Sequence, residues 1–360
     1  MNWFAKFRYL LYIQFLFCNF LFAQTDSSQV VSLNLFSSAF FDNKEFTGNI
    51  KKGYTHPGFF LQPTVRLETK GYTVDAGFHM LYLAGTDSLE SFLPVISLQY
   101  NITPSFQMIV GALKSKDNHH LPEPLFKTER SYLNQPEVGV QYKMDTPKFK
   151  GDLWVNWERY IKKGSPFQEQ FTVGLVSLFK PSTFDVKTGT YLSLVAMVTH
   201  QGGQIDSTDL PVTTILNTGG TVGYLFDVGI GNAVAKIEFN EFLSTHNSSS
   251  LVKKFKEGTA FQPKIALIWP NIKVELGYWY ANSFYNPRGE ELFGSTSTVS
   301  ASFDEKTRSL VTLELSLFKL ASREFSINTG FNAYYDTKNN IIEYSYVFKM
   351  IFDGKIFSKL

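Results

Sequence analysis

The chain has 360 residues and a formal net charge of +2, from 34 Lys and Arg against 32 Asp and Glu. This near balance gives no case for nucleic-acid binding, which needs a strongly basic surface. Apolar residues make up 44% and aromatic residues 16% of the chain, yet apolar runs such as 191–198 are too short for a helical membrane span. The single cysteine, Cys18, excludes a disulfide framework and a zinc-type cysteine cluster.

The N-terminal segment has the features of an export signal. Lys6 and Arg8 precede an apolar stretch over residues 9–22, which ends at a cleavage site after Ala23. Residues 1–23 are therefore predicted to be a signal peptide. The alternative is a transmembrane anchor, but the run has about 14 residues where a helical span needs about 20.

Apolar and polar residues alternate in about sixteen stretches across residues 24–360, which we predict to form one domain. Ile342, Tyr344 and Tyr346, for example, alternate with Glu343 and Ser345. Because successive side chains of a strand point to opposite faces, each stretch has one apolar and one largely polar face. The predicted strands are 30–41, 58–68, 71–83, 92–100, 105–113, 135–144, 149–161, 168–180, 185–199, 214–228, 232–243, 258–269, 272–283, 308–319, 324–335 and 341–352.

The connections between these strands are alternately short and long. The long ones lie near residues 42–57, 84–91, 114–134, 162–167, 200–213, 244–257, 284–307 and 336–340. Residues 295–303 are counted as loop, although they could instead pair with the next strand as a hairpin. Aromatic residues such as Tyr82, Tyr100 and Trp269 gather at strand ends, as in an interfacial girdle.

The regular alternation of short and long connections distinguishes between two all-β folds. A soluble β-sandwich also has alternating strands, but nothing in it requires short and long connections to alternate. Outer-membrane barrels have short periplasmic turns, long extracellular loops and an even strand count. We therefore predict an all-β, antiparallel, up-and-down transmembrane β-barrel in the bacterial outer membrane.

The pattern resembles the outer-membrane porins, sixteen-stranded diffusion channels of the general or phosphate-selective type, and barrel proteins of Bacteroidetes-like bacteria. The resemblance implies that the third external loop, residues 114–134, folds inward and narrows the pore. Residues 121–126 are faintly similar to the proline-glutamate-phenylalanine turn of that loop, but the glycines that follow it in the family are absent. The implied constriction residues are Lys114, Lys116, Asp117, Glu123 and Arg130.

Polar residues at inward strand positions predict a water-filled lumen, because about sixteen strands enclose more space than side chains fill. The predicted pore-lining residues are Arg66, Glu68, Asp75, His79, Glu137, Lys143, Asp152, Glu158, Lys236, Glu238, Lys273, Glu275 and Glu314. Alternatively, these charges pair across the wall and merely satisfy one another. Lysine clusters in the loops favour at most a weak anion preference.

Two other functions stay open at this point. A barrel enzyme acting on lipid has few candidates: His119-His120 for a metal, or His79 with a serine, and no serine has a G-x-S-x-G motif. A non-conducting scaffold, or a subunit of a secretion or uptake machine, would have a plugged lumen. We predict a porin-like channel for small hydrophilic solutes that is not an enzyme and has no catalytic residue, metal or cofactor. The expected partners are outer-membrane lipid and lipopolysaccharide, and a homo-oligomer stays open.

Overall fold

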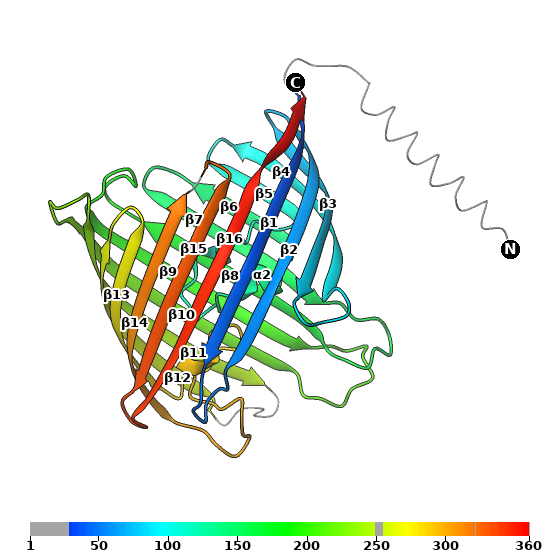
Figure 1. Cartoon of the computed structure of the whole chain (residues 1–360). Helices are drawn as coiled ribbons and strands as arrows, with labels where there is room; N and C mark the ends of the chain where they lie inside the picture. The colour runs from blue at the N-terminus through cyan, green and yellow to red at the C-terminus, as the bar shows by residue number, and fades with distance from the viewer. Residues whose placement is uncertain (1–28, 249–254, 321, 360) are drawn as a thin grey trace.

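The computed structural model describes residues 29–248, 255–320 and 322–359. The predicted signal peptide, residues 1–23, lies outside this part. Sixteen strands form one closed antiparallel barrel in which each strand pairs with its neighbours in the chain. The first strand pairs with the last and closes the barrel, as the adjacent blue and red ribbons show (Figure 1).

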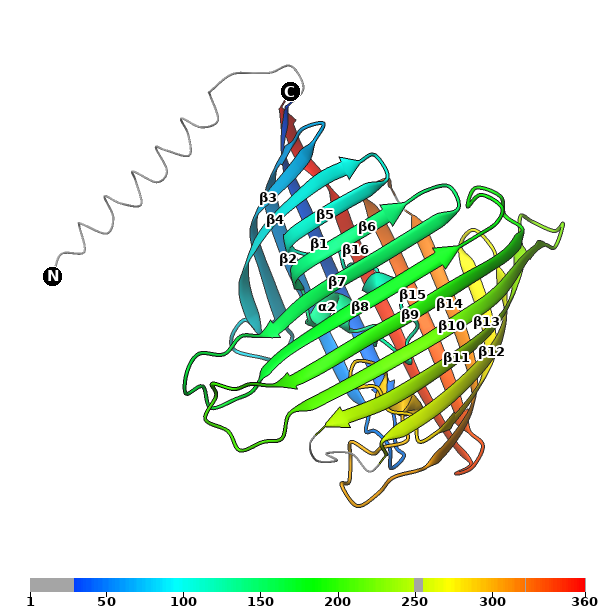
Figure 2. The same cartoon turned by 180° about the vertical axis from the view of Figure 1, so that it is seen from behind.

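The strands run in chain order around the wall (Figures 1 and 2). They are β1 (Val30–Glu45), β2 (Tyr54–Glu68), β3 (Tyr72–Leu83), β4 (Ser91–Thr103), β5 (Phe106–Ala112), β6 (Val138–Asp145), β7 (Phe149–Arg159), β8 (Glu169–Phe179), β9 (Gly189–Gly202), β10 (Thr213–Asp227), β11 (Val234–Ser248), β12 (Glu257–Ile268), β13 (Ile272–Asn282), β14 (Thr307–Leu320), β15 (Phe325–Asp336) and β16 (Ile341–Lys359). Each predicted strand overlaps one of them, so the predicted up-and-down barrel is confirmed.

Several strands extend further than predicted. β1 continues to Glu45 and β16 to Lys359, because the two strands pair along their whole length, from Val31 opposite Lys359 to Glu45 opposite Tyr344. Backbone pairing of this kind depends on the partner strand. It therefore cannot be predicted from the alternation of apolar and polar residues in either segment alone.

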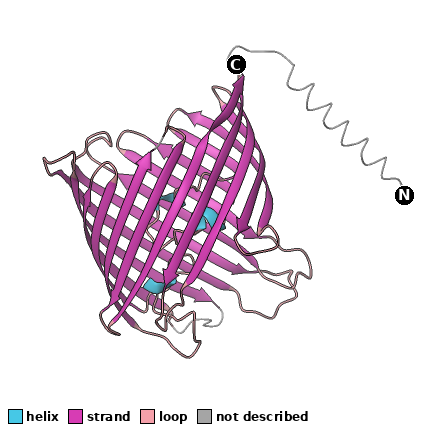
Figure 3. Ribbon diagram, viewed as in Figure 1, coloured by secondary structure: helices cyan, strands magenta, loops and turns pink. Residues whose placement is uncertain are grey.

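In the described parts of the long loops, three short helices are present: η1 (Asn118–His120), α2 (Arg130–Leu133) and η2 (Glu291–Phe293). Figure 3 shows the helical segments in cyan within the outline of the barrel. Residues 295–303 contain no strand, as predicted, and one isolated bridge joins Thr296 to Asp304. Within the described part of the chain, no helix is long and apolar enough to span a bilayer.

Large apolar side chains cover the outer face of the wall. Ile96, Leu194 and Ile342 are each about two thirds exposed, at 66%, 65% and 66%. An apolar belt of this extent is stable against the acyl chains of a bilayer and would aggregate in water. The inward positions of the same strands carry polar residues, so the period of two that was predicted from the sequence sorts side chains between lipid and lumen.

Candidate functional site

Three external loops, residues 46–53, 113–137 and 283–306, pack together inside the barrel, and we call them the plug. Buried apolar side chains join the loops to one another and to the wall. They include Phe46, Leu121, Leu125, Phe126, Phe284, Leu292 and Phe293 from the plug with Trp154, Met197, Phe242, Trp279 and Tyr334 from the strands. The plug therefore fills part of the lumen with a hydrophobic core of the kind found in soluble proteins.

Buried ion pairs also hold the plug. The Glu290 carboxylate accepts from the ammonium groups of Lys44 and Lys51, and its side chain is 0% exposed. Lys44 also contacts Glu129 at 2.9 Å, and Lys51 contacts Glu291 at 2.6 Å. Such buried charges are stable only when paired, so these contacts fix the three loops relative to each other and to β1.

The constriction loop predicted from the porin resemblance, residues 114–134, is part of the plug. Glu123 accepts from the Tyr334 hydroxyl at 3.0 Å, and Arg130 lies 3.3 Å from Glu158 on β7. Lys114, Lys116 and Asp117, at the start of the same loop, also line a cavity in the lumen.

His119 lies at the centre of this loop. Its Nε2 contacts Glu137 at 2.9 Å and its Nδ1 contacts Asp152 at 3.0 Å, while its ring stacks on Trp154 with centroids 3.7 Å apart. Burial alone would lower the pKa of His119, but the hydrogen bonds to the two carboxylates outweigh it and raise that pKa above its usual value. The neighbouring His120 points away and is 65% exposed at its side chain, so the two histidines do not share a site.

This arrangement predicts that alkaline pH loosens the plug. A histidine whose pKa is raised by folding stabilises the native state fully below its unfolded pKa, near 6.5, and the stabilisation is lost as the pH rises through the folded value. Each unit by which folding raises the pKa corresponds to about 1.4 kcal/mol. Urea unfolding midpoints in detergent, measured from pH 6 to 9, should fall for the native chain and stay level for His119→Gln. Equal pH dependence in both proteins would contradict this role of His119.

Most of the predicted pore-lining residues are paired within the wall. On β2 and β3, Arg66 contacts Asp75 through two hydrogen bonds of 2.7 and 3.0 Å. Across the other side of the lumen, the contacts are Lys236–Glu238 at 2.7 Å, Lys264–Glu275 at 2.9 Å and Lys273–Glu314 at 2.8 Å. The predicted residues therefore meet in pairs, as in the alternative in which charges satisfy one another.

The remaining predicted residues lie in four different settings. Glu137, Asp152 and Glu158 contact residues of the plug, whereas Lys143 lies 3.5 Å from Asp152 and faces the lumen. Glu68 is exposed near the periplasmic end of β2. His79 is fully buried, with Nδ1 3.2 Å from the Gln62 side chain, so the structure does not bring it together with a serine as a catalytic pair.

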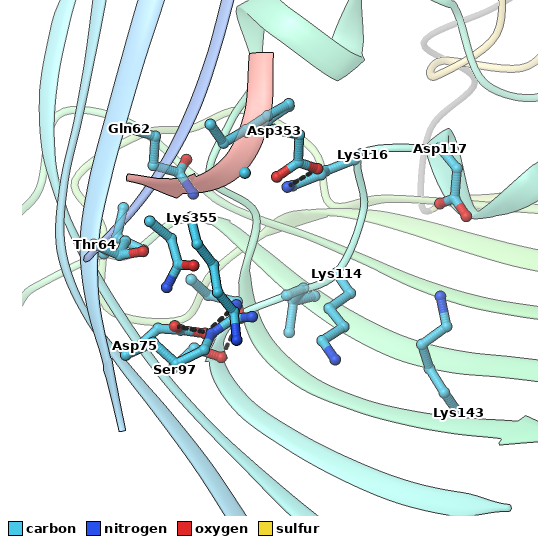
Figure 4. A pocket seen from close by; sticks show the side chains of 17 residues that line it. Gln62, Thr64, Asp75, Ser97, Lys114, Lys116, Asp117, Lys143, Asp353 and Lys355 are labelled. Atoms are coloured by element: carbon cyan, nitrogen blue, oxygen red, sulfur yellow. Dashed lines mark hydrogen bonds and ion pairs between the residues drawn. The ribbon is translucent and has the colours of Figure 1, made fainter. Parts of the chain in front are cut away.

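Two of the cavities in the lumen reach the side of the short turns, which is the periplasmic side of an outer-membrane barrel. One of about 550 Å³ lies beside β1–β6 and β16 and is shown in Figure 4. The other, of about 700 Å³, lies beside β6–β12. Lys114 and Lys143 line both, so the cavities adjoin at these two side chains. We call the pair of cavities the vestibule.

A second polar site lies on the outer face of the wall, where β8–β10 reach the long loops. His200 continues the outward-facing series of Leu192, Leu194 and Val198 on β9, and its Nδ1 lies 2.9 Å from the Thr214 hydroxyl on β10. Its ring stacks on Phe171, with centroids 4.8 Å apart.

Phe171 in turn stacks on the exposed Trp157, with centroids 5.2 Å apart. The Trp157 indole donates to Glu169 at 3.1 Å. Such a surface, with an imidazole, a hydroxyl, a carboxylate and two aromatic rings, suits the boundary between headgroups and acyl chains. We call it the rim site.

The rim site was missed at the level of sequence. The predicted strand ended at residue 199, which assigned His200 to the following loop. The alternation of outward residues that ends in Val198 would have included His200 if it had been continued by one more step. Thr214 lies at the start of the next predicted strand, and no motif around it in the sequence indicates a nucleophile.

Solved structures of outer-membrane proteins share this fold. OccAB2 of Acinetobacter baumannii is similar over 91% of this chain and 98% of its own, with a TM-score of 0.51 and 10% identity. A loop deletion mutant of OmpT, an outer membrane protein of Vibrio cholerae, is similar over 90% of this chain and 99% of its own, with a TM-score of 0.51 and 10% identity. An anion-selective porin from Comamonas acidovorans is similar over 91% of this chain and 100% of its own, with a TM-score of 0.50 and 8% identity. The protein is thus an outer-membrane barrel, and the predicted resemblance to porins holds for the fold.

The family assignment differs from that resemblance. No curated protein matches the sequence significantly. A profile of the family described as Lipid A 3'-O-deacylase-type matches residues 23–359. A deacylase is an enzyme, so the prediction that the chain is not an enzyme is wrong. That prediction relied on strands of alternating apolar and polar residues and on alternately short and long connections, and porins and enzymes of the outer membrane share both features. Since the match covers nearly the whole sequence, this chain belongs to the Lipid A 3'-O-deacylase-type family.

Proposed function

We propose that this protein hydrolyses an ester-linked acyl chain of a lipid A-type lipid in the outer leaflet of the outer membrane. The observation that carries the proposal is the pair formed by His200 and Thr214, with Nδ1 and Oγ1 2.9 Å apart on the lipid-facing rim. A base within hydrogen-bond reach of a hydroxyl is the arrangement that activates an oxygen nucleophile. The family of the chain supports the same chemistry.

The rim site suggests a two-step reaction. His200 accepts the proton of the Thr214 hydroxyl, and the Thr214 oxygen attacks the ester carbonyl carbon of the lipid. The sugar oxygen leaves and takes the proton from His200, so an acyl-threonine ester remains. Water, deprotonated by His200, then cleaves this ester and releases the fatty acid, which restores Thr214. The net reaction consumes one ester and one water, and gives one acid and one alcohol.

The aromatic side of the rim site accounts for the choice of a lipid substrate. Trp157 and Phe171 form a stacked apolar surface directly beside His200. An acyl chain lying on this surface would place its ester next to the imidazole, because the aromatic girdle of a barrel lies at the depth of the headgroups.

Release of fatty acid from lipid A by the refolded protein in mixed micelles tests the proposal. We expect ester-linked chains to be released and amide-linked chains to be retained, because the alcohol is a much better leaving group than the amine. Retention of all chains, with a barrel shown to be folded by its heat-modifiable migration, would contradict the proposal.

Passive diffusion of small hydrophilic solutes, the function predicted from the porin resemblance, is the competing candidate. The polar, charged vestibule suits it, but the plug that packs inside the barrel opposes it. Since the plug packs inside the barrel, we expect no conductance steps from the intact protein in a planar bilayer. Deletion of residues 116–132, which removes much of the plug, should give large steps. Large steps from the intact protein would instead support a channel.

A further inference from the structure

The periplasmic vestibule has an imbalance of charge that the proposed lipid chemistry does not use. Five cationic side chains, Arg66, Lys114, Lys116, Lys143 and Lys355, line the smaller cavity, against three carboxylates, Asp75, Asp117 and Asp353. In Figure 4, a dashed line joins Lys116 to Asp353, whereas no dashed line joins Lys114 or Lys143 to another of the residues drawn.

Each of the three carboxylates is already engaged. Asp75 is held by Arg66 through two hydrogen bonds. Asp353 lies 2.7 Å from Lys116, and Asp117 lies 3.0 Å from His120. Among the described residues that line this cavity, no carboxylate is thus left over for Lys114.

Lys114 is held in place by neutral groups. Its backbone N–H donates to the Gln141 side chain at 2.9 Å, and the Gln141 amide donates back to the Lys114 carbonyl at 3.1 Å. Its ammonium group donates to the Gln99 side-chain oxygen, which carries no charge. Enclosure by the barrel wall lowers the pKa of Lys114, and the positive charges of Arg66 and Lys143 lower it further.

Lys143 is only partly neutralised. Its nearest carboxylate, Asp152, is 3.5 Å away and already accepts from Gln141 at 2.8 Å and contacts His119 at 3.0 Å. Lys114 and Lys143 therefore present two ammonium groups to the vestibule at the junction of its cavities, and both would be stabilised by a bound anion.

We propose that Lys114 and Lys143 form a binding site for a small oxyanion, of the phosphate class, that enters the vestibule from the periplasm. Ammonium groups bind phosphate as strongly hydrated point charges with rotatable donors, and a cavity of about 550 Å³ holds a solute much larger than phosphate itself. The site is separate from the rim site, since it lies on the opposite face of the wall. Its occupation does not depend on lipid hydrolysis.

Calorimetric titration of the refolded full chain with inorganic phosphate, at low and constant ionic strength, tests this site. We expect saturable binding of one phosphate per chain, and Lys114→Gln and Lys143→Gln should each weaken it about tenfold or more through loss of a charged hydrogen bond. Lys114→Arg keeps the charge and should retain most of the affinity, which separates loss of charge from loss of folding.

The matched control is Lys70→Gln, which removes an exposed lysine from a periplasmic turn. It should bind phosphate like the native chain. Absence of saturable binding by the native protein would overturn the site. So would an equal loss of affinity in the Lys70 and Lys114 variants, because phosphate would then respond only to net charge.

Discussion

Replacement of His200 by Ala is expected to lower the rate of lipid deacylation by about 100- to 10,000-fold, the usual contribution of a positioned general base. The change removes the imidazole that hydrogen-bonds the Thr214 hydroxyl across the strand pair, at 2.9 Å. Thr214→Val keeps the shape of the side chain and removes the nucleophile, so it should cause a loss of similar size. Fatty-acid release from lipid A under single-turnover conditions measures both.

His120→Ala is the matched control for this experiment. His120 is also a solvent-accessible histidine, but it lies in the plug, where it contacts the Asp117 carboxylate at 3.0 Å. Its replacement should leave the rate unchanged. Rates equal to that of the native protein in the His200 and Thr214 variants would contradict catalysis at the rim site.

Replacement of Glu290 by Gln is expected to destabilise the barrel by about 3 kcal/mol. The loss of one partner from a buried ion pair usually costs about 3–5 kcal/mol, because a charge is left unpaired. The lower end applies here, since Lys44 keeps Glu129 and Lys51 keeps Glu291. Urea unfolding in detergent or lipid vesicles, followed by tryptophan fluorescence, measures the change.

Glu90→Gln provides the comparison for this prediction. Glu90 is an exposed residue of the loop before β4, so its change of charge should alter the free energy of unfolding by less than about 0.5 kcal/mol. If the two variants unfold at the same urea concentration, the ion pairs seen inside the plug do not contribute to stability.

The barrel could be predicted from the sequence, because the alternation that specifies each strand involves only neighbouring residues. Ile342, Tyr344 and Tyr346 face lipid while Glu343 and Ser345 face the lumen, so a period of two is repeated in each strand. Parity of loop lengths then distinguished a barrel from a sandwich. Several strand ends were predicted too short, because backbone pairing with the neighbouring strand continues beyond the alternation of apolar and polar residues.

The plug could not be predicted in the same way. Its central ion pair joins Lys51 and Glu290, which are 239 positions apart in the sequence. Neither lies in a periodic segment, and each reads as an ordinary charge in a solvated loop. The porin resemblance drew attention to residues 114–134, but it gave no indication that residues 46–53 and 283–306 pack against them.

The prediction that the chain is not an enzyme was wrong for a different physical reason. Catalysis at a lipid interface needs only a few polar atoms on an otherwise apolar face, and a single histidine at a strand end is a weak signal in a chain with six. The enzymatic candidates that the sequence offered were His119-His120 in a loop and the inward-facing His79, and His200 was not among them. The structure buries His79 fully and places His200 outside.

Mass spectrometry of lipid A after incubation with the native protein and with His200→Ala, in parallel, tests the proposed function most directly. We expect the native protein to convert lipid A to a species that has lost one ester-linked acyl chain and gained the free hydroxyl, and the variant to leave it unchanged. Intact lipid A in both reactions, with both barrels folded, would contradict hydrolysis of lipid by this chain.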